Sequence, residues 1–137
     1  MTQTATEVDW RRLAAKAGPY PPEAYHFVRD GLGRTMELVH GQPGAPEGDR
    51  HVSGQQLCMG LREYAIERYG MMACSVLHSW HVERTDDFGR IVFAMIDAGL
   101  LSKTSRDSLE DFRGVFDFHE AFSRDRLVTA IGRRTGA

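Results

Sequence analysis

Apolar residues recur through most of the chain at the three- and four-residue spacing that places them on one helix face. The strongest stripe predicts a helix over residues 85–99, which Gly99 ends. Thr85 is the expected N-cap, and negative charge at Asp86 and Asp87 suits the positive end of the helix dipole. The residues of this stripe are Phe88, Ile91, Val92, Met95 and Ile96.

A second stripe predicts a helix that begins near Pro22 and ends at His40-Gly41. Gly31 and Gly33 interrupt it, and each costs about 1 kcal/mol relative to alanine in a helix. We therefore expect another helix to cross this one closely at the glycines. The apolar positions of the stripe are Tyr25, Val28, Leu32, Met36 and Val39.

The third helix has the clearest local start signal of the chain. Ser53 and Gln56 have the spacing of a capping box, and Val52 and Leu57 that of a hydrophobic staple. This helix should run to residue 69 and end at Gly70. A shorter helix is expected over residues 71–80.

The remaining segments complete a single, mainly α-helical domain, an orthogonal helical bundle. We expect a frayed N-terminus over residues 1–8, a short helix over 9–17, a flexible Gly/Pro loop over 41–50 and a loose basic tail over 132–137. After residue 101 the pattern leaves two alternatives open. One is further helix, and the other is a short β-hairpin, which would give a winged-helix-like fold.

Composition narrows the class of protein. The 137 residues suit one domain, and the 42% of hydrophobic residues suffice for a core. With 17 Lys and Arg against 19 Asp and Glu, a polybasic nucleic-acid binder is excluded. The chain has neither an apolar run of membrane-spanning length nor a signal-peptide pattern, and its two cysteines read as free thiols. We therefore expect a cytoplasmic protein.

One group of side chains resembles a zinc site. Cys74, His78 and His81 share one side of the helix over residues 71–80, and Cys58 lies on the preceding helix. Structural zinc sites usually draw on cysteine pairs two to four residues apart, whereas these two are sixteen apart. We therefore expect the three residues to be bystanders beside the core and expect no metal. A metal-dependent enzyme at Cys74, His78 and His81 is the second alternative function.

Other catalytic patterns are absent from the sequence. Asp86 and Asp87 are adjacent on a helix and point about 100° apart, so they are not expected to share one acid–base site. Asp117 belongs to an acidic run that lacks the order of a calcium loop. No phosphate-binding loop or nucleophile elbow is found. No catalytic residue and no cofactor are predicted.

The helices over residues 71–80 and 85–99, with the turn 81–84, have the order of a helix-turn-helix. A winged-helix nucleic-acid binder using Arg84, Arg90, Arg133 and Arg134 is therefore the first alternative. Asp86 would repel phosphate where such a helix must approach it. We instead favour a non-enzymatic protein-interaction module, which contacts an unknown protein or a second copy of itself. The expected contact residues are Trp80, His81, Arg84 and Arg90.

The block from His51 to Phe122 resembles a family of short conserved hypothetical proteins found mainly in planctomycete and verrucomicrobial bacteria. That family has no assigned activity, so the resemblance implies no site residue. A small residue, often Gly, follows the tryptophan in that family, whereas His81 stands here. The segments that carry the resemblance are Val52-Ser53-Gly54, Leu61–Ala65, Tyr69-Gly70, Trp80, Thr85–Gly89 with Ile91–Phe93, and Asp107–Phe122.

Overall fold

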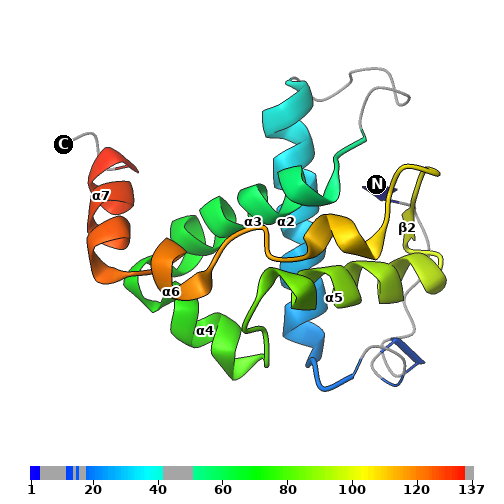
Figure 1. Ribbon diagram of the computed structural model, residues 1–137, viewed down its shortest axis with the longest axis horizontal. Helices are drawn as coiled ribbons and strands as arrows, with labels where there is room; N and C mark the ends of the chain where they lie inside the picture. Colours follow the sequence, from blue (N-terminus) through cyan, green and yellow to red (C-terminus); the bar gives the residue numbers. More distant parts are fainter. Residues whose placement is uncertain (4–11, 14, 16–17, 42–50, 135–137) are drawn as a thin grey trace.

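The computed structural model describes residues 1–3, 12–13, 15, 18–41 and 51–134 (Figure 1). The expectation of a mainly α-helical bundle is confirmed. No helix in the described ranges combines the length and the apolar character that crossing a membrane requires. The elements are β1 (Thr2–Gln3), α2 (Pro22–His40), α3 (Gly54–Tyr69), η2 (Gly70–Met72), α4 (Ala73–Ser79), α5 (Thr85–Asp97), β2 (Leu101–Ser102), η3 (Leu109–Phe112), α6 (Phe118–Ala121) and α7 (Arg124–Arg134).

Helix α2 runs across α3 and α5 (Figure 1) and packs against both. The crossing with α3 is as close as the glycine in α2 predicted. A Cβ atom on Gly31 would lie 2.3 Å from Cδ2 of Leu61, and one on Gly60 would lie 2.0 Å from Oγ1 of Thr35. Glycine on each of the two helices therefore lets their backbones approach, because any larger residue would have to push its neighbour aside.

The predicted first and last residues of the helices agree with the structure where capping or terminating residues nearby in the sequence set them. Pro22 is the first residue of α2, and Gly41 follows its last. The Ser53 hydroxyl accepts from the N–H of Gln56, and the Gln56 side chain accepts from the N–H of Ser53. Gly70 ends α3 with a φ of 53°, a left-handed value that glycine tolerates best.

A chain of aromatic rings runs from the core to partly buried positions at its edge. Phe27 of α2 lies 5.3 Å from Tyr64, 5.5 Å from Trp80 and 6.5 Å from Phe88, measured between ring centroids. Phe88 in turn lies 5.9 Å from Phe118 of α6. The rings therefore connect α2, α3 and α5 with the segment that follows η3. The α5 stripe is buried as predicted at four of its positions, namely Phe88, Ile91, Val92 and Met95.

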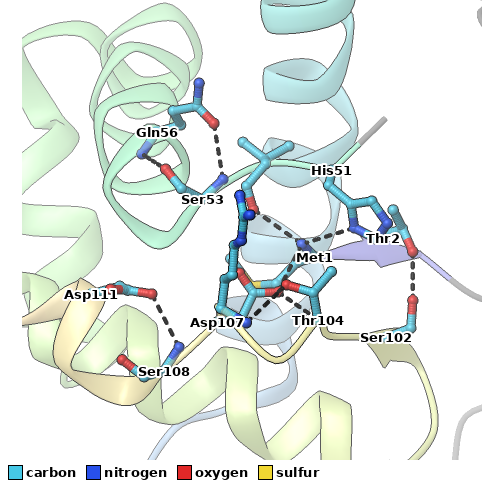
Figure 2. A network of polar contacts seen from close by, with 12 residues as sticks. Met1, Thr2, His51, Ser53, Gln56, Ser102, Thr104, Asp107, Ser108 and Asp111 are labelled. Atoms are coloured by element: carbon cyan, nitrogen blue, oxygen red, sulfur yellow. Dashed lines mark hydrogen bonds and ion pairs between the residues drawn. The ribbon is translucent and has the colours of Figure 1, made fainter. Parts of the chain in front are cut away.

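The start of the chain differs from the sequence prediction. Residues 1–3 are not frayed, because Thr2 and Gln3 pair antiparallel with Ser102 and Leu101. The amino group of Met1 donates to the carbonyl of Val52 at 3.1 Å and to Asp107 at 3.2 Å (Figure 2). Leu101 therefore pairs with a strand at the start of the chain, and of the two alternatives left open after residue 101 the β-hairpin is not formed.

Further expectations are corrected or lie outside the described residues. Helix α5 begins at Thr85 itself, so Thr85 is not its N-cap. Helix α7 extends to Arg134, so residues 132–134 are helical and not a loose tail. Met71 and Met72, at the start of the helix expected over residues 71–80, instead belong to η2 and are exposed. The loop over 42–50, residues 135–137 and most of the expected helix over 9–17 lie outside the described residues.

Replacing Gly60 with alanine should lower the free energy of unfolding by about 1–3 kcal/mol, as overpacking of a tight contact does. The new methyl group would meet Thr35 at 2.0 Å from Oγ1 and 2.8 Å from Cγ2. The matched control is Gly132→Ala in α7, where no atom lies within 4 Å of the added Cβ. Alanine is the better helix former, so this control should be neutral or slightly stabilising in urea denaturation. Equal effects of the two changes would contradict the close crossing.

Candidate functional site

A hollow of about 720 Å³ lies where α4, the start of α5 and the segment after η3 meet. We call it the α4–α5 hollow. Its volume is in the range of about 300–1,000 Å³ that is usual for ligand sites. The residues that line it are Cys74, His78, Glu83, Arg84, Asp86, Gly114, Phe116, Asp117, Phe118 and His119.

The turn beside the hollow is held by the buried carboxylate of Asp87. This carboxylate accepts hydrogen bonds from the backbone N–H groups of Glu83, at 2.8 Å, and Arg84, at 3.2 Å. It also accepts from the Tyr20 hydroxyl and from the guanidinium of Arg90, at 2.9 Å. Four donors satisfy a carboxylate that is only 8% exposed, and burial without them would be costly. Asp87 therefore joins the segment before α2 to the turn between α4 and α5.

This arrangement shifts the pKa of both side chains that donate to Asp87. Burial and, after it, the hydrogen bond to Asp87 together raise the pKa of Tyr20 to about 12, because that bond needs the protonated hydroxyl. The hydrogen bond with Tyr20 and the nearby carboxylates raise the pKa of Arg90. Tyr20 thus remains a neutral donor and Arg90 a cation throughout the physiological range.

Residues 114–119 form the second wall of the hollow, and hydrogen bonds tie this segment to the first turn of α5. The N–H of Val115 donates to Oγ1 of Thr85 at 3.0 Å, and the N–H of Gly114 donates to Oδ1 of Asp86 at 3.3 Å. Behind this segment, Phe116 stacks on Phe118 with ring centroids 5.4 Å apart. The hollow therefore has an apolar aromatic wall and a charged rim, both held by contacts within the fold.

Two of the three residues of the predicted zinc pattern, Cys74 and His78, line this hollow. They are not brought together with His81 as ligands, since no group of three or more His, Cys, Asp or Glu side chains in the described ranges could hold a metal ion. Nδ1 of His78 instead lies 3.2 Å from Oε1 of Glu83. Burial raises the pKa of Cys74, which disfavours the reactive thiolate. Cys58 is fully buried on α3.

The four predicted contact residues differ in their surroundings. Arg84 lines the α4–α5 hollow, whereas Arg90 lines a neighbouring hollow of about 260 Å³. Trp80 is partly buried and packs on Phe27 and Tyr69. His81 is exposed and has a φ of 63°, so it occupies a left-handed position that favours glycine.

The arginines of the alternative nucleic-acid surface lie on separate elements. The residues after β2 form turns, η3 and α6 in place of a wing. Helix α7, which carries Arg133 and Arg134, lies apart from α5, which carries Arg90 (Figure 1). Asp86 lines both hollows, between Arg84 and Arg90. Phosphate would therefore meet a carboxylate between the two arginines.

Sequence reasoning missed the residues that the second wall contributes. Asp117 and His119 lie in the acidic run that lacks the order of a calcium loop, and Phe116 and Phe118 lie in the segment after residue 101 whose pattern left two alternatives open. One local signal was available, because Asp117 caps α6 by accepting from the N–H of Glu120. That signal marks the start of a helix, but it does not indicate that Asp117 and α4 line the same hollow.

We expect Asp87→Asn to lower the free energy of unfolding by about 2–3 kcal/mol, because one amide oxygen cannot replace a carboxylate that accepts from four donors. Asp86→Asn is the matched control on the adjacent residue. Its amide oxygen can still accept from Gly114, and the change should cost less than about 1 kcal/mol. Urea denaturation at pH 7 measures both. Similar losses in the two variants would show that Asp87 does not have the anchoring role.

The stability that Tyr20 contributes should fall at high pH. Below pH 10 the tyrosine is protonated in both the folded and the unfolded chain, so its full contribution is present. Between pH 10 and about 12 the unfolded chain releases the proton first, and the contribution is lost. Tyr20→Phe should therefore be less stable than the wild type at pH 8, and the difference should narrow above pH 10. A constant difference up to pH 11.5 would contradict this.

The chain matches no family model, no curated protein and no solved structure in the comparisons that were made. The resemblance given above thus stays a prediction. The geometry and charge of the α4–α5 hollow are the observations from which a function can be proposed.

Proposed function

We propose that this protein is a non-enzymatic protein-interaction module, and that it receives a segment of a protein partner in the α4–α5 hollow. The observation that carries the proposal is the combination of an aromatic wall with a charged rim in one concave surface. Interfaces are commonly built in this way, with aromatic contacts at the centre and polar groups around them.

The titratable groups of the rim support binding more than catalysis. Each interacts with a different group, since His78 pairs with Glu83, Asp86 accepts from Gly114, and Asp117 caps α6. His78 thus has an acidic partner in Glu83, but within the described ranges no hydrogen bond joins His78 to a nucleophile such as Cys74, as nucleophilic catalysis would need. Cys74, the one thiol in the hollow, has a raised pKa. A metal-dependent enzyme at Cys74, His78 and His81 is therefore less well supported.

The charge of the hollow favours a protein over a nucleic acid. Three carboxylates line it, against one guanidinium and two imidazoles. A phosphate backbone would be repelled by this rim, whereas a protein segment can match it with its own charges. We further propose that the module works in the cytoplasm, because Cys58 and Cys74 are free thiols.

A photocrosslinking experiment tests the proposal. The photoreactive residue p-benzoylphenylalanine replaces His119, which is exposed at the rim, or, as a control, Glu37, which is exposed on α2. After irradiation in lysate of the native host, the variant at position 119 should form a discrete protein adduct that survives nuclease and is reduced by excess untagged wild type. The variant at position 37 should not form this adduct. A nuclease-sensitive adduct, or equal labelling at both positions, would contradict the proposal.

A further inference from the structure

We infer that the segment bound in the α4–α5 hollow presents an arginine side chain, whose guanidinium pairs with Asp86 and Asp117. This inference rests on the proposed function and names the chemistry of the partner. Three observations support it: the charges of the rim, the hydrogen bonds that the rim carboxylates already accept, and the aromatic side chains that line the hollow.

Asp86 and Asp117 of the hollow differ in their partners from the two carboxylates that hold distant segments together. Asp87 is paired with Arg90, and Asp107 with the amino group of Met1. In contrast, neither Asp86 nor Asp117 forms an ion pair within the described ranges. Each accepts one backbone N–H, from Gly114 and Glu120 respectively. A carboxylate has about four acceptor positions, so both retain capacity for donors from a bound molecule.

Arginine fits this pair of carboxylates better than lysine does. A guanidinium carries five N–H donors in a fixed planar fork, so it can donate to two carboxylates at once, whereas an ammonium acts as a compact point charge. Asp86 is half-buried beside the segment that it holds through Gly114. Ion pairs at partly buried positions are screened less by water and salt than exposed ones.

The aromatic wall is also suited to a guanidinium on a long aliphatic stem. Such stems pack along apolar surfaces while the charged end remains among polar groups. Phe116 already has one such neighbour, since Cζ of Arg62 lies 5.9 Å from its ring centroid. Phe116 and Phe118 both line the hollow, so the stem of a bound arginine would meet apolar atoms of these rings.

Arg84 allows the effect of charge on binding to be tested in the opposite direction, because it is a cation in the same hollow. Its exposed side chain lines the same hollow, so it opposes the entry of another cation. Its fixed contact with the fold is made by its backbone N–H, which donates to Asp87. Removing the guanidinium should therefore strengthen the binding of an arginine segment and leave the turn intact.

The test uses three short peptides, acetyl-Gly-Arg-Gly-amide and its lysine and citrulline counterparts, titrated into the full chain at low salt. Amide chemical shifts in two-dimensional NMR spectra report the binding. We expect saturable shifts at Gly114, His119 and Arg84 with the arginine peptide, at least about fivefold weaker binding of the lysine peptide, and no saturation with citrulline. Equal affinity for the arginine and lysine peptides, or the absence of saturable shifts, would overturn the assignment of arginine.

Paired variants locate the site. The double change Asp86→Asn with Asp117→Asn should weaken the arginine peptide at least about fivefold, and both asparagines can keep the backbone hydrogen bonds. The control is Glu37→Gln with Asp125→Asn, which removes the same charge from exposed residues of α2 and α7 and should leave affinity unchanged. Equal weakening in both doubles would show attraction to net charge alone and would overturn the site.

Arg84→Gln keeps the inference testable if the variant with both Asp86→Asn and Asp117→Asn does not fold. It should bind the arginine peptide about two- to fivefold more tightly than the wild type, as expected when a neighbouring like charge is removed. Unchanged or weaker binding would count against the site. If no peptide binds but the crosslinked adduct at position 119 forms, the proposed interaction module is retained and the assignment of arginine is wrong. Failure of the adduct would instead contradict the proposed function itself.

Discussion

The buried carboxylate of Asp87 is the constraint on which the hollow depends. It is nearly removed from water, and such a charge persists only when donors surround it. Those donors come from Tyr20, from two consecutive backbone N–H groups before α5 and from Arg90 on the next turn. For all of these donors to reach the carboxylate, the start of α5 must lie against the segment that leads into α2. One ionised side chain thus fixes the turn that carries Glu83 and Arg84.

The aromatic chain extends this constraint to the other wall. Phe27 and Phe88 pack together in the core, and Phe88 contacts Phe118 of α6. The backbone of residues 114 and 115 is then tied to Asp86 and Thr85. Neither wall of the hollow is an unsupported loop. A binding surface built in this way needs little ordering when a partner arrives, which lowers the entropic cost of association.

The distribution of ion pairs shows which charges the fold itself uses. Asp87 and Asp107 are held by partners far away in the sequence and contribute to stability. Exposed pairs such as Arg113 with Glu110 contribute little, because water screens both partners. The carboxylates of Asp86 and Asp117 belong to neither group, and for that reason they are the charges that the proposed partner engages.

Local sequence rules determined where most helices begin and end. Pro22, the capping box at Ser53 and the stop at Gly70 act through residues at most four positions away, so the sequence alone predicts them. The stripe of α5 also predicted its buried face. The tertiary structure alone distinguished Asp87 from Asp86, because Tyr20 reaches Asp87 across 67 positions. It also paired Leu101 with Gln3 and placed α4 opposite Asp117. These contacts join distant segments through packing, and no local spacing in one sequence encodes them.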